Sequence, residues 1–231
     1  MKIFLIPNQI AETPQGPLPV FVSGIEHLRV FFVEEIKSGR RLLKKIIPEL
    51  DIGQCVFYDI NEHTPFKEIE HHFQQIQSQD IGVISEAGCP CVADPGADLV
   101  FLAHKYGYEV IPFVGPSSIL LSLMASGLSG QNFAFSGYLP KDRKERIQKL
   151  KTLEQRSVRE KQTQIFMEAP YRNENLFADI LQFCNPDTLL CVAIDLMGPA
   201  QYIKMLSIKE WTRQAVSLHK KPALFILGQR T

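Results

Sequence analysis

The stretch IGVISEAGCPCVADPGADLV, from Ile81 to Val100, decides the fold expected for this chain. Ile81, Val83 and Ile84 form a short apolar run that is typical of a buried parallel strand, and glycines and prolines then interrupt regular structure until a helix begins near Ala97. In an open α/β sheet, ligands bind outside the carboxyl ends of the strands, so the stretch predicts a binding loop. An ordinary crossover loop is the alternative.

Short strands alternate with helices along the rest of the sequence. We predict strands at 2–7, 30–36, 55–58, 81–84, 108–113, 133–136, 164–168, 189–196 and 223–227, and helices over 66–77 and within 115–128. This βαβ rhythm is typical of an α/β protein with a mainly parallel sheet. The pattern changes after Phe113, where a helix with Pro116 near its start follows. The sequence therefore predicts two α/β domains, residues 1–113 and residues 114–231.

The composition is that of an ordinary globular protein, with 45% hydrophobic residues among 231. Lys plus Arg and Asp plus Glu number 25 each, so a nucleic-acid partner requires a local basic patch. No apolar run reaches the roughly 18 residues that span a bilayer, and the first residues resemble a strand more than a signal peptide. We therefore expect a cytoplasmic protein without a membrane partner. Five cysteines without a C-x-x-C pair favour reduced thiols and no metal site.

Two short segments carry polar side chains that suit ligand binding. GPSS, at 115–118, places Ser117 and Ser118 at a helix start, where free amides and the helix dipole attract anions. An ordinary helix cap is the alternative. MEAPYR, at 167–172, follows a strand with Glu168 and Arg172, which could orient a polar ligand or a phosphate. A structural ion pair is the alternative there.

Two further segments offer acid and base groups. Glu34 and Glu35 follow an apolar strand, so one of them is expected to point toward a ligand, with plain surface exposure as the alternative. DINEHT, at 59–64, groups Asp59, Glu62 and His63, a combination that permits general-base catalysis at neutral pH.

Two basic segments suit phosphate binding. SGRRLLKKII, at 38–47, predicts a helix with an apolar face and a face that carries Arg40 and Arg41. The segment from Lys141 to Lys161 holds nine basic and four acidic residues. Such a patch neutralises phosphates, although solvated helix faces have the same composition.

Four segments together resemble one family. They are ISEAGCPCVADPGADLV, VIPFVGPSSILLSLMASGL, FAFSGYLPKDRKERIQKL and IFMEAPYR, and their order and spacing resemble the tetrapyrrole methylase superfamily. The likeness is to the branch that methylates the ribose 2′-hydroxyl of a cytidine in small-subunit ribosomal RNA. It implies a two-domain α/β methyltransferase with a mainly parallel amino-terminal sheet, a mixed carboxy-terminal sheet and S-adenosylmethionine in the cleft between them. It also implies a homodimer that acts on ribosomal RNA or the small ribosomal subunit, and not on DNA.

The resemblance also implies which residues bind the cofactor, and we add our own candidates for the base and for the phosphate contacts. The cofactor would be bound by Ser85, Glu86, Ala87, Gly88, Pro90, Ser117, Ser118 and Pro170. Candidates for the base that removes the hydroxyl proton are Glu35, His63 and Glu168. Phosphate contacts are expected from Arg40, Arg41, Arg143 and Arg172.

The sequence departs from the branch on the acceptor side. Residues 7–21, PNQIAETPQGPLPVF, lack the usual proline and glycine pattern, and residues 34–41, EEIKSGRR, keep a carboxylate and arginines but lack the usual aspartate and threonine. Residues 194–204, IDLMGPAQYIK, lack the usual threonine, lysine and glutamate, and the small carboxy-terminal extension of longer relatives is absent. Two alternatives therefore stay open: a methyltransferase for a small molecule such as a tetrapyrrole precursor, and a non-catalytic RNA-binding relative.

Overall fold

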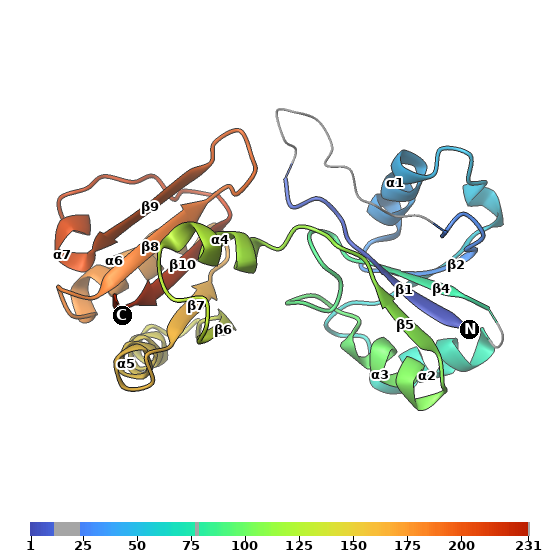
Figure 1. The fold of residues 1–231 in the computed structure, drawn as a ribbon, viewed down its shortest axis with the longest axis horizontal. Coiled ribbons are helices and arrows are strands. Elements are labelled where there is room, and N and C mark those ends of the chain that lie inside the picture. Colours follow the sequence, from blue (N-terminus) through green and yellow to red (C-terminus); the bar gives the residue numbers. More distant parts are fainter. Residues whose placement is uncertain (12–23, 77–78, 231) are drawn as a thin grey trace. The chain divides into compact units, whose positions relative to one another are not determined.

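The computed structural model describes residues 1–11, 24–76 and 79–230. The chain divides into two compact units and passes from the first to the second between Ser117 and Ser118 (Figure 1). The boundary predicted from sequence lies a few residues earlier, after Phe113. No helix in the described part of the chain is long and apolar enough to cross a membrane.

The first unit contains a five-stranded sheet whose neighbouring strands all run parallel, in the order β3-β2-β4-β1-β5. Its strands are β1 (Lys2–Ile6), β2 (Val30–Val33), β3 (Val56–Asp59), β4 (Ile81–Ile84) and β5 (Glu109–Pro112). The strand predicted over 30–36 is too long, because the Glu35 side chain accepts hydrogen bonds from the first turn of a helix and the strand ends at Val33.

Helices cover both faces of this sheet (Figure 1). They are α1 (Ile36–Ile46), α2 (Phe66–Gln75) and α3 (Ala97–Lys105), and a short 3-10 helix spans Ile52–Gln54. On one face, Leu43 of α1 packs in a cluster with Phe31 of β2. On the other face, Phe73 of α2 and Leu102 of α3 pack in a cluster with Phe32. The unit is therefore a three-layer α/β sandwich.

The order of the strands locates the edge where a ligand is expected. The chain runs from β1 to β2 and β3 on one side, returns to β4, and continues to β5 on the other side of β1. The direction of winding thus reverses between β4 and β1. In open α/β sheets, the crevice at such a reversal, outside the carboxyl ends of the strands, is where ligands bind.

The second unit contains a mixed five-stranded sheet in the order β6-β7-β10-β8-β9. β6 and β7 are parallel, and the other neighbours are antiparallel. Its strands are β6 (Phe133–Tyr138), β7 (Thr163–Met167), β8 (Leu189–Ile194), β9 (Tyr202–Ser207) and β10 (Ala223–Gly228). The sequence analysis misses β9 and finds the others. A parallel sheet in the first unit and a mixed sheet in the second confirm the predicted fold class.

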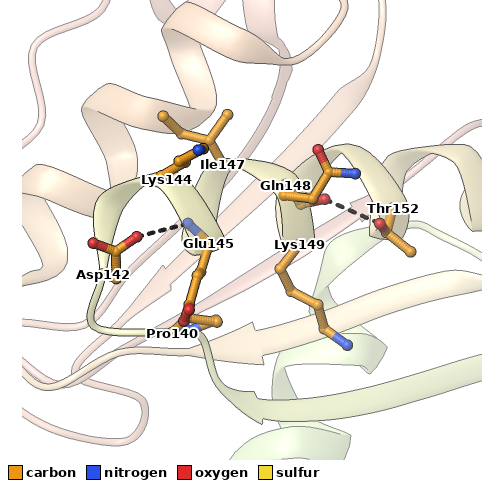
Figure 2. A pocket seen from close by; sticks show the side chains of 8 residues that line it. All are labelled: Pro140, Asp142, Lys144, Glu145, Ile147, Gln148, Lys149 and Thr152. Atoms are coloured by element: carbon orange, nitrogen blue, oxygen red, sulfur yellow. Dashed lines mark hydrogen bonds between the residues drawn. The ribbon is translucent and has the colours of Figure 1, made fainter.

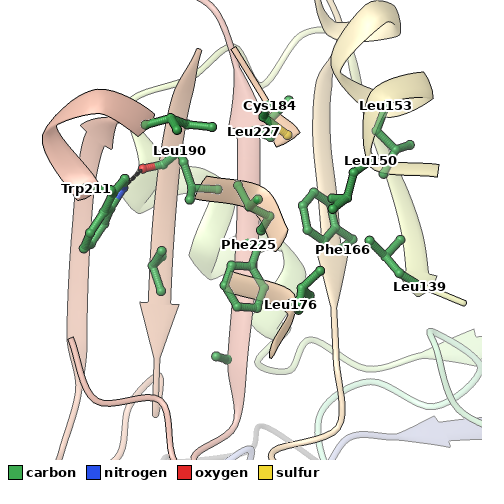
Figure 3. Close-up of a cluster of buried hydrophobic side chains, with 14 of the residues drawn as sticks. Leu139, Leu150, Leu153, Phe166, Leu176, Cys184, Leu190, Trp211, Phe225 and Leu227 are labelled. Carbon is green, nitrogen blue, oxygen red and sulfur yellow. Dashed lines mark hydrogen bonds between the residues drawn. The ribbon is translucent and has the colours of Figure 1, made fainter. Parts of the chain in front are cut away.

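Helices also pack on the sheet of the second unit. They are α4 (Ser118–Ser126), α5 (Arg143–Arg159), α6 (Asn173–Phe183) and α7 (Ile208–Trp211). α5, α6 and α7 share one buried cluster with the sheet (Figure 3). Within it, the rings of Phe166 and Phe225 stack with centroids 5.9 Å apart, and the Trp211 indole donates a hydrogen bond of 2.8 Å to the carbonyl of Leu190. Each buried aromatic ring contributes about 1.5–3 kcal/mol, so this core fixes β7 and the segment that follows it.

Candidate functional site

Three loops meet at the carboxyl edge of the first sheet, where the winding reverses. The loop after β1 and the loop after β4 are joined by a pair of backbone hydrogen bonds, from Asn8 N to Gly88 O (2.8 Å) and from Gly88 N to Asn8 O (3.1 Å). The Asn8 side-chain amide also donates to the carbonyls of Glu86 (2.7 Å) and Ser85 (3.3 Å). Asn8 therefore holds the backbone of the predicted binding loop against the end of β1.

The loop after β5 joins the same assembly through close backbone contacts. The Cys89 thiol lies 3.4 Å from the carbonyl oxygen of Pro116 and 3.6 Å from that of Gly115. A Cβ at Gly115 would lie 2.1 Å from the ring of Pro7, and a Cβ at Gly88, where φ is +77°, would lie 3.3 Å from the carbonyl of Pro116. Glycine is required at position 115 because the Pro7 ring fills the space of a side chain, and at position 88 because its positive φ and the nearby carbonyl disfavour a Cβ.

The rest of the loop has an unusual backbone. Cys91 and Ala93 adopt left-handed conformations, with φ of 67° and 64°, and Gly96 has a φ of 123° just before α3. Left-handed conformations at residues other than glycine cost about 1–3 kcal/mol and cluster at functional sites. The three interlocked loops hold this shape, and they contain every cofactor residue that was predicted in the first unit.

Three carboxylates lie at this edge. The Ser38 hydroxyl donates to the Glu86 carboxylate, and the Glu86 amide donates to the Glu34 carboxylate at 3.3 Å. Burial raises the pKa of Asp94 from 3.8 to about 6; the charges of Glu34 and Glu86 add to the rise, and a hydrogen bond from Ser85 opposes it. The concentration of negative charge suits a ligand that carries a positive charge or hydroxyl donors.

Two of the three predicted base candidates lie in the first unit, and neither belongs to these loops. Both carboxylate oxygens of Glu35 cap α1, accepting from Lys37 N (2.8 Å) and Ser38 N (2.7 Å). These backbone hydrogen bonds lower the pKa of Glu35, which makes it a weaker base. His63 lies in the turn after the edge strand β3, 3.5 Å from Glu62, and 85% of its side chain is exposed.

Arg40 and Arg41 lie on the solvent side of α1. The Arg40 guanidinium lies 5.0 Å from the centre of the Phe57 ring, a cation–π distance. Both residues are exposed, and neither makes an ion pair with any residue that the structure describes. They are available for phosphates.

In the second unit, Glu168 and Arg172 form an ion pair in the segment that follows β7. Glu168 is buried; its Oε1 accepts from Ala169 N at 2.8 Å and from the Arg172 guanidinium. Glu168 Oε2 and Arg172 Nε are also buried, and neither has a hydrogen-bond partner within residues 1–11, 24–76 and 79–230. Pro170 is exposed beside them, and the Arg172 guanidinium lies 5.4 Å from the centre of the Tyr171 ring. Ser118 begins α4, as predicted.

Arg143, a predicted phosphate contact, takes part in an ion-pair network between α5 and α6. Its Nε lies 3.0 Å from Asp179, which is buried and also binds Arg146 at 2.6 Å, and its Nη2 lies 3.1 Å from Gln182. The side chain of Arg143 stays 61% exposed, so the guanidinium is oriented by protein and reachable from solvent.

A hollow of about 740 Å³ runs along the first turns of α5 (Figure 2). Asp142 caps this helix by accepting from Glu145 N at 2.9 Å. The hollow is lined by Pro140, Asp142, Lys144, Glu145, Ile147, Gln148, Lys149 and Thr152. Its lining includes none of the site residues that were predicted individually, but it lies on the basic segment 141–161, for which phosphate binding was predicted.

Sequence reasoning missed several residues that shape these sites. Asn8 acts across 78 positions of sequence, and no local signal marks it. Asp94 lies in the quoted loop, but no role was predicted for it from sequence. Asp179 and Arg146 pair between two helices, a contact that periodicity does not reveal.

The chain is similar in sequence to several proteins named ribosomal RNA small subunit methyltransferase I. It is 32% identical over 211 residues to the Vibrio cholerae protein, covering 90% of this chain and 69% of that protein. It is 38% identical over 164 residues to the Bacillus subtilis protein, covering 67% and 54%. It is 30% identical over 191 residues to the Synechocystis protein, covering 81% and 66%. The chain thus spans about half to two thirds of the length of these relatives. No protein-family model matches it.

Among solved structures, a crystal structure of the methyltransferase CobJ has the same fold. Its TM-score is 0.60 at 13% identity, and the match covers 100% of this chain and 96% of that chain. This likeness concerns the fold alone. The sequence relatives confirm the resemblance inferred from the four motifs, and with it the prediction of a methyltransferase family. The chain belongs to the ribosomal RNA small subunit methyltransferase I family.

Proposed function

We propose that this chain is an S-adenosylmethionine-dependent methyltransferase that modifies the ribose 2′-hydroxyl of a cytidine in small-subunit ribosomal RNA. The main support is the sequence similarity to proteins named ribosomal RNA small subunit methyltransferase I. The 32% identity to the Vibrio cholerae protein extends over 90% of the chain. The proposal includes a cytoplasmic homodimer whose partner is ribosomal RNA or the small ribosomal subunit.

The edge of the first sheet has the chemistry that the cofactor requires. Gly88 and Gly115 let the loops after β1, β4 and β5 pack closely against one another, which fixes the shape of the edge on which an adenosyl group would lie. Glu34, Glu86 and Asp94 provide negative charge for a cationic ligand. We assign cofactor binding to this edge, to the loop of Ser85, Glu86, Ala87, Gly88 and Pro90, and to Ser117, Ser118 and Pro170.

When bound, the cofactor would supply a methyl group on a sulfonium centre. The protein's share of such a displacement is to orient the acceptor hydroxyl, exclude water and take up the hydroxyl proton. Among Glu35, His63 and Glu168, we favour Glu168 as the group that accepts this proton. Its buried Oε2 has no hydrogen-bond partner among the described residues, whereas both oxygens of Glu35 are used in the helix cap and His63 is almost fully exposed.

Glu168→Gln tests the assignment, because the glutamine keeps the size of the side chain and removes the base. It is expected to lower kcat by about a hundredfold or more while S-adenosylmethionine affinity changes by less than about threefold. An equal loss of turnover and of cofactor affinity would assign Glu168 to binding instead. Glu35→Gln and His63→Gln, which alter the other two candidates, provide the comparison.

Basic side chains in both units would bind the RNA backbone. We assign phosphate contacts to Arg40 and Arg41, which are exposed on α1, and to Arg143 and Arg172 in the second unit. Each neutralised phosphate of a single strand lowers the slope of log affinity against log salt by about 0.7. Arg40→Gln and Arg41→Gln should flatten that slope, and an unchanged slope would remove them from the interface.

Calorimetry followed by methyl transfer tests the proposal as a whole. The protein is titrated with S-adenosylmethionine, and the complex is then incubated with small ribosomal subunits that lack the methyl mark. Binding with transfer supports the proposal. Binding with transfer only to a tetrapyrrole precursor would favour the small-molecule alternative, and no cofactor binding would favour a non-catalytic RNA-binding protein.

A further inference from the structure

An exposed aromatic and basic surface lies at one edge of the sheet of the second unit. β6 and β7 are parallel neighbours, with Tyr138 opposite Met167, so the segments that follow both strands leave the sheet at the same edge. Tyr138 is 60% exposed and Tyr171 is 69% exposed. Lys141 is exposed three residues after the end of β6. We call the surface of Tyr138, Lys141, Tyr171 and Arg172 the tyrosine edge.

The Tyr171 ring packs on the guanidinium of Arg172, which is itself fixed. Its neighbour Arg172 places its guanidinium 5.4 Å from the centre of the ring, and the same guanidinium is anchored by the buried carboxylate of Glu168. The turn is closed by a hydrogen bond of 2.8 Å from Arg172 N to Ala169 O. A ring that is ordered by a fixed cation and open to solvent loses little conformational entropy when a flat ligand stacks on it.

The charge around the tyrosine edge is positive. α5 begins just after Lys141 and carries seven basic and two acidic residues among its 17. Arg143, at its start, is oriented by Asp179 and stays largely exposed. Two of these basic residues, Lys144 and Lys149, line the hollow along the same turns, together with the acidic Asp142 and Glu145 (Figure 2). Two carboxylates lie three residues from Tyr171 in sequence: Glu168, whose charge is countered by Arg172, and the exposed Glu174, which lies 4.0 Å from His219.

Exposed aromatic rings beside basic side chains are the features that bind single-stranded nucleic acid. The rings stack on bases, and the cations neutralise the backbone. Paired RNA offers no exposed base faces, so a stacking platform selects unpaired segments. We propose that the tyrosine edge binds an unpaired segment of RNA, with one nucleobase stacked on Tyr171 and adjacent phosphates contacted by Lys141 and Arg172. This inference rests on the proposed RNA function and adds the form in which the RNA is held.

Equilibrium binding to two oligoribonucleotides tests this role of Tyr171. The probes are a fluorescent 12-nucleotide oligocytidylate and an otherwise identical oligomer with abasic sites, and binding is followed by anisotropy without cofactor. Stacking of one base makes a difference of about five- to hundredfold in affinity. Tyr171→Ala should weaken oligocytidylate binding by that factor and leave abasic binding unchanged, whereas Tyr171→Phe, which keeps the ring, should bind both probes like the wild type.

Control variants separate stacking from folding and from charge. Phe101→Ala removes a ring of α3 that is 60% exposed in the first unit, and it should bind both probes like the wild type. Lys141→Gln should weaken the binding of both probes and flatten the dependence of log affinity on log salt. Equal losses of Tyr171→Ala on both probes, no loss on either, or wild-type binding that does not depend on the bases would each overturn the inference.

These outcomes are distinguishable from failure of the proposed function. Base-dependent binding through Tyr171 in a protein that transfers no methyl group would count against the proposed enzyme and support this surface. Methyl transfer to ribosomal subunits together with base-independent binding would do the reverse.

Discussion

Replacing Asp94 with asparagine is expected to stabilise the protein at neutral pH and to weaken its binding of a cationic cofactor. Burial and the charges of Glu34 and Glu86 raise the pKa of Asp94 from 3.8 to about 6, so the folded protein favours the neutral carboxyl. The stability gained from that protonation is fully present below about pH 4 and is lost as the pH rises through about 6. Above pH 6, the folded protein therefore holds an unfavourable charge that asparagine removes.

The size of the effect follows from the pKa. A rise from 3.8 to about 6 corresponds to about 3 kcal/mol without screening, and the half-exposed position of Asp94 reduces this to about 1 kcal/mol. At pH 7.5, Asp94→Asn should therefore be more stable than the wild type by about 1 kcal/mol, or on the order of 4 °C in Tm. Near pH 4, the stabilities of the wild type and Asp94→Asn should differ by much less.

Urea unfolding at pH 4 and at pH 7.5 provides the assay for stability. Asp98→Asn is the matched control, because Asp98 is exposed in the first turn of α3, where asparagine should give no gain. Calorimetry with S-adenosylmethionine and with S-adenosylhomocysteine, which lacks the sulfonium charge, provides the assay for binding. Asp94→Asn should weaken the binding of S-adenosylmethionine more than the binding of S-adenosylhomocysteine. A variant that is less stable than the wild type at pH 7.5, or a difference that does not change with pH, would refute the reasoning.

Three further substitutions test the structure of the sites. Asn8→Ala removes two side-chain hydrogen bonds to loop carbonyls and should cost about 2 kcal/mol in urea unfolding and weaken S-adenosylmethionine binding; wild-type affinity would contradict the anchoring role. Gly88→Ala places a side chain at a φ of +77° and should cost about 1–2 kcal/mol, with cofactor affinity reduced in calorimetry; an unaltered melting curve would show that the backbone relaxes freely. Asp179→Ala leaves the buried Arg146 unpaired and should cost about 3–5 kcal/mol, whereas Asp187→Ala at an exposed site should cost less than about 0.5 kcal/mol.

The architecture could be predicted largely from sequence because short-range patterns carry it. The apolar run before Ser85 marks β4, and Gly96 before Ala97 marks the start of α3, as the structure shows. β9 was missed because YIKMLS follows a loop of Gly, Pro and Ala and lacks the continuous apolar run of its neighbour β8. Its position depends on pairing with β8, a long-range contact that local periodicity does not encode.

The candidate site was predictable only where the sequence itself is unusual. The glycines and prolines of 85–96 marked the loop, but its anchor, Asn8, looks like any turn residue until the fold brings it to Gly88. Glu35 was predicted as a base because it follows a strand, and the structure uses both of its oxygens to cap α1. Arg143 was predicted as a phosphate contact from local charge, whereas its pairing with Asp179 depends on how α5 packs on α6.

Transfer of a labelled methyl group from S-adenosylmethionine to small ribosomal subunits that lack the mark would show whether this chain methylates ribosomal RNA. Alkaline hydrolysis then shows where the label lies, because a 2′-O-methyl group blocks attack of the ribose hydroxyl on the adjacent phosphate. If the chain is a ribose methyltransferase, the label is found in an alkali-resistant dinucleotide that contains cytidine, and Glu168→Gln loses that label. Cofactor binding without label in the RNA would contradict the proposed function. Label on a base, in mononucleotides that alkali releases, would contradict it as well.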